Sequence, residues 1–190
     1  MSAFLYIKNW FTDPYVAAIA PTSKFGIGRI MEKIDFRKNI LIIEYGPGTG
    51  NFTGVLLKHM TPRSKLIAIE RNHKLCQVLR RNIQDPRLMI FEDSAENVID
   101  ILKSCNGSIE LEADYIISGI PFSLVPRQAK IVILNNSHNI LKEGGKFLAY
   151  QTFFQLPEFL KTPLTELFSI VRAQYVLPCL PPLLILEAIK

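Results

Sequence analysis

Short apolar runs alternate with segments of helical periodicity along most of the chain. The runs are rich in Ile, Leu, Val and Phe, as buried strands of a parallel sheet are. They predict strands at residues 41–44, 65–70, 87–91, 113–118, 146–151, 169–177 and 183–189. The segments between them predict helices at residues 24–34, 51–60, 72–82, 95–103 and 126–141. This alternation is typical of an α/β fold in which a mostly parallel, seven-stranded sheet carries helices on both faces.

Two connections in the second half of the chain affect where the predicted helices and strands end. Lys142-Glu-Gly144-Gly145 predicts a glycine stop for the helix that precedes the fifth strand. Residues 152–168 are apolar for a connection and are interrupted by Pro157 and Pro163. This segment fits either a lid over an apolar substrate or a short helix packed on the sheet.

The most informative stretch joins the first strand to the first crossover helix, Leu41-Ile-Ile-Glu44-Tyr-Gly46-Pro-Gly48-Thr-Gly50. A buried parallel strand here leads into a tight turn and a helix N-terminus, where backbone N–H groups can face a ligand. Glycine lets the backbone approach that ligand closely. A dinucleotide-binding fingerprint needs a third glycine three positions after the second, and Asn51 stands there instead.

The spacing Glu44-x-Gly46-x-Gly48-x-Gly50 resembles the first motif of the class I S-adenosylmethionine-dependent methyltransferases. The resemblance implies a Rossmann-like domain that binds S-adenosylmethionine and releases S-adenosylhomocysteine. It also implies that the turn wraps the methionine end of the cofactor and that Glu44 helps to orient it. Glu70 ends the second strand, where a carboxylate can accept hydrogen bonds from both ribose hydroxyls. An exposed acid at a strand end, without a ligand, is the alternative for Glu70.

The same resemblance places an acid after the third strand against the exocyclic amine of adenine. Asp93 matches that position, and Glu92 is the competitor. The expected cofactor-binding residues are Glu44, Gly46, Gly48, Gly50, Glu70, Arg71, Asp93, Ser94 and Ser118.

Composition narrows the class of protein. The 190 residues support one domain of ordinary size, and no apolar run approaches the roughly 18 residues of a membrane span. The net charge of +5 and the pI near 9.1 favour a negatively charged partner, either nucleic acid or an anionic membrane surface. Three scattered cysteines, Cys76, Cys105 and Cys179, fit a reducing cytoplasm and predict neither a disulfide framework nor a metal site. The start of the chain has no basic segment before its apolar residues, so no signal peptide is expected.

The N-terminal part is expected to form a helical segment, residues 1–34, that caps the methyltransferase domain at residues 35–190. Residues 1–11 are aromatic-rich and amphipathic, so they can lie in a bilayer interface or pack on the core. The helix at residues 24–34 is expected to turn five apolar side chains inward: Phe25, Ile27, Ile30, Met31 and Ile34.

The loop after the fourth strand, Gly119-Ile-Pro-Phe122-Ser, is the expected meeting point of acceptor and methyl group, because chemistry in open α/β sheets sits at the carboxyl ends of strands. This loop is similar to the Asn-Leu-Pro-Tyr/Phe motif of the RNA adenine dimethyltransferases. In that family the Asn holds the adenine amine and the aromatic ring stacks on the base. Gly119 stands at the Asn position and offers no side-chain acceptor. An unmet amine in a closed site costs about 1–3 kcal/mol.

Nearly the whole chain is similar to the bacterial phospholipid N-methyltransferases. The similarity rests on the aromatic N-terminal segment, Ala18-Ile-Ala-Pro-Thr-Ser23, the glycine turn, Ser118-Gly-Ile-Pro-Phe122, Gln151-Thr-Phe and Pro181-Pro182. It implies stepwise methylation of phosphatidylethanolamine towards phosphatidylcholine, with no nucleic acid partner. The closely related ornithine-lipid N-methyltransferases share these motifs. A protein of this kind is expected in the cytoplasm, held peripherally on the inner face of the membrane through its N-terminal helix.

The chemistry of an alkyl amine determines the expected acceptor residues. Its pKa is about 10.4, so a partly desolvated pocket must favour the neutral form before the lone pair can attack. Backbone carbonyls around Ser118 and Gly119 are expected to orient the amine. Aromatic rings suit a nitrogen that becomes a methylated cation. The expected catalytic residues are Ser118, Gly119, Phe122 and Tyr150, and the expected substrate-binding residues are Tyr15, Arg127, Lys130 and Gln151. Arg127 and Lys130 are the candidates for the lipid phosphate, with a solvated helix face as the alternative.

Overall fold

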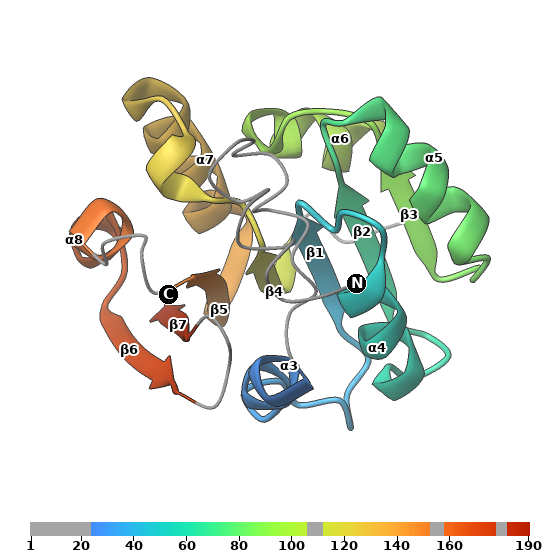
Figure 1. Ribbon diagram of the computed structural model, residues 1–190, viewed down its shortest axis with the longest axis horizontal. Helices are drawn as coiled ribbons and strands as arrows, with labels where there is room; N and C mark the ends of the chain where they lie inside the picture. Colours follow the sequence, from blue (N-terminus) through green and yellow to red (C-terminus); the bar gives the residue numbers. More distant parts are fainter. Residues whose placement is uncertain (1–23, 106–111, 153–157, 178–181) are drawn as a thin grey trace, which may run out of the picture.

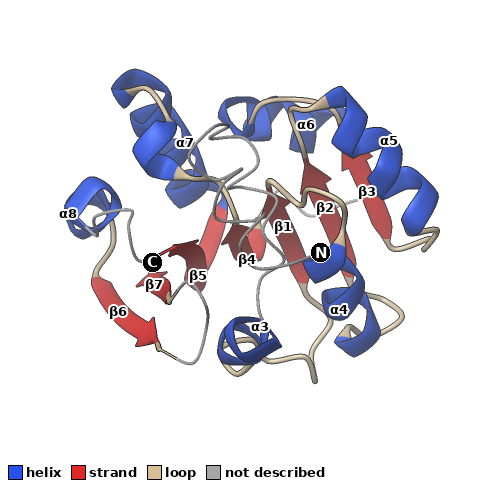
Figure 2. Ribbon diagram, viewed as in Figure 1, coloured by secondary structure: helices blue, strands red, loops and turns tan. Residues whose placement is uncertain are grey.

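A computed structural model of the chain describes residues 24–105, 112–152, 158–177 and 182–190. One seven-stranded sheet runs through the molecule, with helices on both of its faces (Figures 1 and 2). The strands are β1 (Leu41–Tyr45), β2 (Lys65–Ile69), β3 (Leu88–Phe91), β4 (Ala113–Ser118), β5 (Leu141–Thr152), β6 (Ile170–Val176) and β7 (Leu183–Ile189). The α-helices are α3 (Lys24–Met31), α4 (Asn51–His59), α5 (His73–Asn82), α6 (Val98–Ser104), α7 (Arg127–Ile140) and α8 (Glu158–Leu167). Two 3₁₀ turns are η1 (Ala95–Asn97) and η2 (Phe122–Leu124).

The order of the strands indicates where on the sheet a ligand would bind. The order is β3-β2-β1-β4-β5-β7-β6, in which β1 to β5 are parallel and β7 is antiparallel to both of its neighbours. The chain moves outward from β1 to β3 and then returns to place β4 on the other side of β1. Ligands of open α/β sheets bind where the strand order reverses in this way, outside the carboxyl ends of the strands. The predicted fold class is confirmed.

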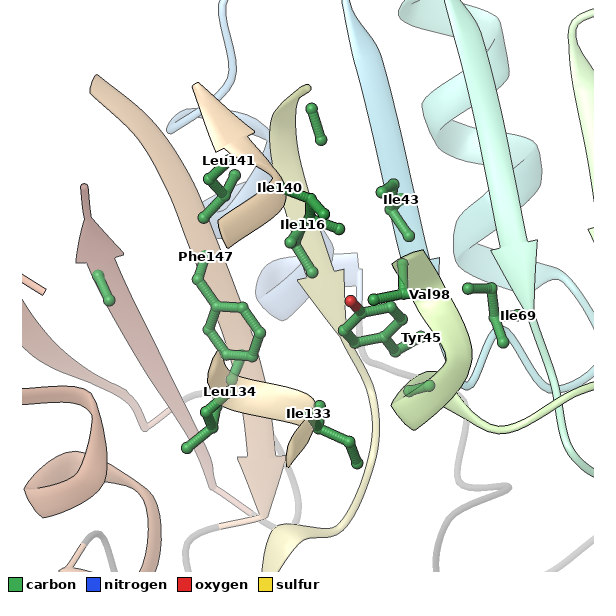
Figure 3. Packing of buried hydrophobic residues seen from close by; sticks show 14 of the residues in the cluster. Ile43, Tyr45, Ile69, Val98, Ile116, Ile133, Leu134, Ile140, Leu141 and Phe147 are labelled. Atoms are coloured by element: carbon green, nitrogen blue, oxygen red, sulfur yellow. The ribbon is translucent and has the colours of Figure 1, made fainter. Parts of the chain in front are cut away.

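Two apolar layers hold the helices against the sheet. On one face, side chains of α6, α7 and α8 pack on the strands, and Figure 3 shows Phe147 and Tyr45 within this layer. On the other face, α3 and α4 pack through Ile30, Phe52 and Leu56. Both faces of the central strands are therefore buried, which explains why the sequence of β1 is a continuous apolar run broken by a single acid.

The structure corrects two local expectations and decides between two alternatives for a third segment. β5 begins at Leu141 rather than near residue 146, because α7 ends at Ile140 and residues 142–145 form an irregularity inside the strand. Phe25, expected to face inward, is 65% exposed. Residues 158–167 form α8, whose Leu160 and Leu164 are fully buried, so this part of the apolar connection is a helix packed on the sheet.

The N-terminal segment is described only in part. Residues 1–23, including the amphipathic stretch at 1–11 and Tyr15, lie outside the described residues, so the domain boundary expected at residue 34 stays a prediction. The helix α3 belongs to the apolar layer that it shares with α4. Within the described residues, no helix has the length and the apolar character that a bilayer crossing requires.

A buried carboxylate ties the α3 side of the molecule to the end of the sheet. Glu187 on β7 is 4% exposed, and its two oxygens lie 3.0 Å from Lys33 Nζ and 3.1 Å from Lys146 Nζ. Lys146 Nζ also donates to the Lys33 carbonyl oxygen at 3.1 Å. Burial raises the pKa of Glu187, but the hydrogen bonds from Lys33 and Lys146 outweigh it and hold this pKa below its usual 4.5.

We expect Glu187→Gln to lower the free energy of unfolding at pH 7 by about 2–3 kcal/mol, because two partly buried ammonium groups lose their counter-charge. A carboxyl whose pKa is lowered by folding stabilises the protein above its unfolded pKa and loses that effect as the pH falls through the folded value. The difference between variant and wild type should therefore shrink below about pH 4.5. Urea unfolding at several pH values measures it.

Glu32→Gln is the matched control. It removes the same charge from an exposed pair, in which Arg29 Nη1 lies 3.1 Å from Glu32 Oε2. Exposed pairs of this kind contribute little, so the change should stay within about 0.5 kcal/mol. Equal effects of the two substitutions would contradict a structural role for Glu187.

Candidate active site

The glycine turn after β1 has a backbone that side chains would strain. Gly46, Gly48 and Gly50 have φ values of 67°, 59° and 90°, in the left-handed region. Gly50 is also closely packed, because a Cβ on it would collide with Leu79 Cδ1 and lie 2.9 Å from Ile83 Cδ1. A Cβ on Gly48 would meet no described residue within 4 Å, so the turn is open on that side as far as the described chain goes. The turn thus packs against α5 at Gly50 and leaves room for a ligand at Gly48.

Glu70 fixes this turn to the end of β2. One of its carboxylate oxygens accepts a hydrogen bond from Gly48 N at 3.1 Å, and the other accepts from Asn72 N at 2.9 Å. Asn72 in turn caps α5, since its side chain accepts from the backbone N–H groups of Lys74 and Leu75. A carboxylate has further lone pairs, and Glu70 is 9% exposed, so it can still accept from a ligand hydroxyl.

Glu44 is a fully buried acid beneath the same turn. Its Oε2 accepts a 2.7 Å hydrogen bond from Thr53 Oγ1 on α4, while Oε1 has no hydrogen-bond partner among the residues that the structure describes. Burial is the main cause that raises the pKa of Glu44 to about 7, and the nearby Glu70 charge adds to it, against the lowering effect of the Thr53 hydroxyl. A buried, half-satisfied carboxyl next to an open turn is suited to a polar or cationic ligand group.

The structure separates the two acids that follow β3. Glu92 is exposed and lies 2.9 Å from His73 Nδ1, which directs it towards α5. Asp93 is partly buried, and its Oδ1 accepts from Ser94 N at 2.6 Å and from Asn97 Nδ2 at 2.7 Å. Asp93 N itself donates to the Glu70 carbonyl oxygen, so Asp93 stands next to the end of β2. This arrangement favours Asp93 over Glu92 as the acid of the site.

The loop after β4 is held in place by its neighbours. Gly119 N donates to the Tyr45 carbonyl oxygen at 2.9 Å, and Ile120 N donates to Ser118 Oγ at 3.3 Å. Gln151 is 4% exposed, and its Nε2 donates to the Ile120 carbonyl oxygen at 3.3 Å. Ser118 and Gln151 therefore position the loop from β4 and β5. For Gln151 this is a contact to the loop backbone, where the sequence predicts one to the substrate.

The two expected aromatic residues have different surroundings. Phe122 is fully buried in the apolar layer beneath α7, with its ring 6.3 Å from that of Phe147. This burial makes Phe122 a core residue in the structure, away from the surface that an amine would reach. Tyr150 is partly buried, and its ring meets Phe52 edge to face at 5.7 Å. Its hydroxyl lies over Gly119, which brings Tyr150 to the glycine turn.

The structure does not place the expected cationic residues together at one binding site. Arg71 and Arg127 are exposed, on the loop before α5 and at the start of α7 respectively. Lys130 is 9% exposed, and burial lowers its pKa, which suits it poorly to a surface phosphate. Tyr15 lies outside the described residues.

Two contributors to the site are missing from the sequence-based set. Thr53 supplies the hydrogen bond beneath the glycine turn, and Asn72 joins Glu70 to α5. An N-cap before a helical segment is a recognisable signal, and Asn72 carries it. Thr53 has no such signal, because only the fold brings it to Glu44.

The chain is similar in sequence to known methyltransferases. The family described as "Ribosomal RNA adenine dimethylase" matches residues 22–98. An ornithine lipid N-methyltransferase of Singulisphaera acidiphila is 24% identical over 161 residues, covering 80% of this chain and 82% of that protein. Ribosomal RNA small subunit methyltransferase A of Mycoplasma mycoides is 33% identical over 97 residues, covering 50% of this chain and 34% of that protein.

Solved structures show the same fold. Precorrin-6y C5,15-methyltransferase of Geobacter metallireducens superposes with a TM-score of 0.71 at 14% identity, over 89% of this chain and 90% of that chain. A SAM-dependent O-methyltransferase of Thermotoga maritima superposes with a TM-score of 0.64 at 18% identity, over 86% of this chain and 64% of that chain. The chain is a class I S-adenosylmethionine-dependent methyltransferase.

The site of this methyltransferase fits its cofactor. S-adenosylmethionine supplies a methyl group on a positively charged sulfur. With respect to the described part of the chain, Gly48 leaves the turn open to the cofactor, and Glu44 Oε1 is a buried acceptor without a protein donor. Glu70 and Asp93 stand at the ends of β2 and β3, on the same edge of the sheet, where they can bind the ribose and the adenine.

We expect the stability of the ligand-free methyltransferase to fall as the pH rises from about 4.5 to about 7, because Glu44 keeps its proton longer in the folded state. The shift in pKa corresponds to about 3 kcal/mol. Glu44→Gln is neutral at every pH and should remove this slope, so it should exceed the wild type in stability at pH 8 and approach it at pH 5. Urea unfolding at both values measures the difference, and parallel pH profiles would contradict it.

We expect Glu70→Gln to weaken S-adenosylmethionine binding about 10- to 100-fold, because the charged acceptor for the ribose hydroxyls is lost. In addition, the amide NH₂ of the glutamine would face one of the two backbone donors, Gly48 N or Asn72 N, which a second donor cannot satisfy. Isothermal titration calorimetry measures the affinity. Glu92→Gln removes the same charge from the exposed neighbouring acid and should leave the affinity within about twofold. Unchanged binding by Glu70→Gln would remove Glu70 from the site.

Proposed function

We propose that this methyltransferase transfers methyl groups to the primary amine of an amino lipid. The observation that carries the proposal is how much of the chain resembles a lipid methyltransferase and how much resembles an RNA methyltransferase family. The likeness to the ornithine lipid N-methyltransferase spans four fifths of both chains, whereas the RNA adenine dimethylase family matches only residues 22–98. That match includes the glycine turn, Glu70 and Asp93 but ends before β4, so it concerns the cofactor half of the molecule.

The acceptor half supports an alkyl amine over adenine. Gly119 offers no side-chain amide, and the Tyr150 hydroxyl takes up the space where a side chain at this position would begin. A planar base would have to stack in this space, whereas an amine on a flexible chain needs only a narrow approach. Phe122, the aromatic residue of the loop, is fully buried in the core and presents no exposed face for stacking.

Exposed apolar side chains along the carboxyl edge of the sheet favour a lipid surface. Leu124, in the turn after β4, is 56% exposed. β6 runs parallel to β5, so it ends on the same edge, where Tyr175 is 51% and Leu177 is 73% exposed. Apolar side chains that protrude near the site can enter the interface of a bilayer, and the net charge of +5 favours an anionic one. Peripheral binding to the cytoplasmic face of a membrane is part of the proposal.

The relative from Singulisphaera acidiphila is an ornithine lipid N-methyltransferase. This likeness favours an ornithine lipid as the acceptor, in place of the phosphatidylethanolamine that the sequence resemblance predicts. Both headgroups carry a primary amine, which is mostly protonated in water, with a pKa of about 10.4 for a comparable lysine amine. Partial desolvation at the carboxyl edge lowers that pKa and favours the neutral amine. Positioning of this amine in line with the methyl group supplies the larger part of the acceleration.

The test is to incubate the enzyme with methyl-labelled S-adenosylmethionine and three acceptors in separate reactions: vesicles with ornithine lipid, vesicles with phosphatidylethanolamine, and total RNA. We expect label in the lipid fraction, with the ornithine lipid the better acceptor. Glu70→Gln serves as a variant with weakened cofactor binding in each reaction. Label in RNA alone would establish an adenine methyltransferase in place of the lipid enzyme, and label in none would contradict both.

A further inference from the structure

Gly119 and Tyr150 occupy the same space at the carboxyl edge of the sheet. They belong to the ends of the adjacent parallel strands β4 and β5, where Ser118 pairs with Ala149. A Cβ on Gly119 would lie 2.5 Å from Tyr150 Oη, 3.0 Å from Tyr150 Cζ and 3.2 Å from the Gly46 carbonyl oxygen. Any side chain at position 119 would therefore displace the tyrosine hydroxyl.

The glycine is required here for space and not for backbone conformation. The glycines with left-handed φ values among the described residues are Gly46, Gly48, Gly50 and Gly144, and Gly119 is not one of them. The φ of Gly119 therefore lies outside the left-handed region that L-residues rarely adopt. A side chain at position 119 would collide with the Tyr150 hydroxyl and crowd the Gly46 carbonyl oxygen, so glycine is the residue that fits this space.

The surrounding contacts hold the hydroxyl in place. The Tyr150 ring packs edge to face on Phe52 of α4. The loop beneath it is fixed by the hydrogen bonds from Gly119 N to the Tyr45 carbonyl and from Gln151 Nε2 to the Ile120 carbonyl. The hydroxyl oxygen and the Gly46 carbonyl oxygen both lie beside Gly119, 2.5 Å and 3.2 Å from the position that a Cβ on it would take, where the strand order reverses between β1 and β4.

We propose that the Tyr150 hydroxyl, seated over Gly119, is the polar group that orients the acceptor amine. This inference rests on the proposed function. The hydroxyl oxygen and the Gly46 carbonyl oxygen accept the two N–H groups of a neutral primary amine, which leaves the nitrogen lone pair for the methyl group. The lone pair forms the N–C bond, the C–S bond breaks with its electron pair going to sulfur, and the resulting ammonium releases one N–H proton to solvent.

The proposal makes the role of Tyr150 depend on how many N–H groups the acceptor has. Each methyl group that is added replaces one N–H, and a neutral dimethylated amine has none. The hydroxyl should therefore matter most for the first transfer and least for the last. A tyrosine that serves only to pack the core would affect all transfers alike.

Tyr150→Phe keeps the ring on Phe52 and removes the hydroxyl. With the unmethylated lipid we expect kcat to fall about 10- to 100-fold, the effect of losing one oriented hydrogen bond in the transition state. With the dimethylated lipid the change should stay within about threefold, and S-adenosylmethionine affinity should stay within about twofold. Tyr115→Phe is the matched control, because its hydroxyl accepts from Asp35 N at the opposite end of β4, and kcat there should be unchanged.

A second measurement needs no acceptor and tests whether a side chain at position 119 collides with the Tyr150 hydroxyl. We expect Gly119→Ala to lower the melting temperature of the wild type, and to lower it less in the Tyr150→Phe background, where the colliding oxygen is absent. Equal losses in the two backgrounds would overturn the steric pairing.

The outcomes separate the two proposals. If the wild type labels lipid and Tyr150→Phe does so equally, or loses all transfers by the same factor, the role of Tyr150 is overturned and the lipid function stands. If the wild type labels no lipid amine, the lipid function is overturned and the role of Tyr150 with it. A selective loss of the first transfer supports both.

Discussion

The arrangement of the site depends on the carboxylate of Glu70. It accepts backbone N–H groups from two different turns, Gly48 after β1 and Asn72 before α5, and so joins the ends of two neighbouring strands. A charged acceptor satisfies these donors more strongly than a neutral one would. The glycine turn then keeps its left-handed backbone in a fixed position relative to β2. The cofactor site is therefore largely formed before any ligand arrives, which agrees with binding sites that lie on a rigid sheet edge.

The part of the site that the sequence predicts best is the part built from local signals. A continuous apolar run predicts β1, the glycine spacing predicts the turn, and an acid at the end of the next run predicts Glu70. Each of these depends on neighbours along the chain. The choice between Glu92 and Asp93 is different, because it depends on His73, which approaches Glu92 from α5. Spacing alone leaves the two acids equivalent.

The acceptor side was harder to predict because it depends on pairing between distant residues. Gly119 in the sequence indicates only the absence of an amide, and Tyr150 indicates only an aromatic ring. Their relation appears once β4 and β5 lie side by side in register. The same limit applies to Phe122, whose motif favours a substrate contact but whose ring is fully buried and packs on Phe147 of β5. The match to the RNA adenine dimethylase family ends at residue 98, before β4. It therefore gives no information about the acceptor half of the molecule.

The position of the antiparallel β7 determines which strand forms one edge of the sheet, where another copy of the molecule could pair. By inserting between β5 and β6 it leaves β6 as the outermost strand on that side, with backbone groups that another strand could extend. Arg172 is exposed at the middle of β6. Two copies that paired edge to edge with these arginines opposite each other would bring like charges together, which disfavours that pairing.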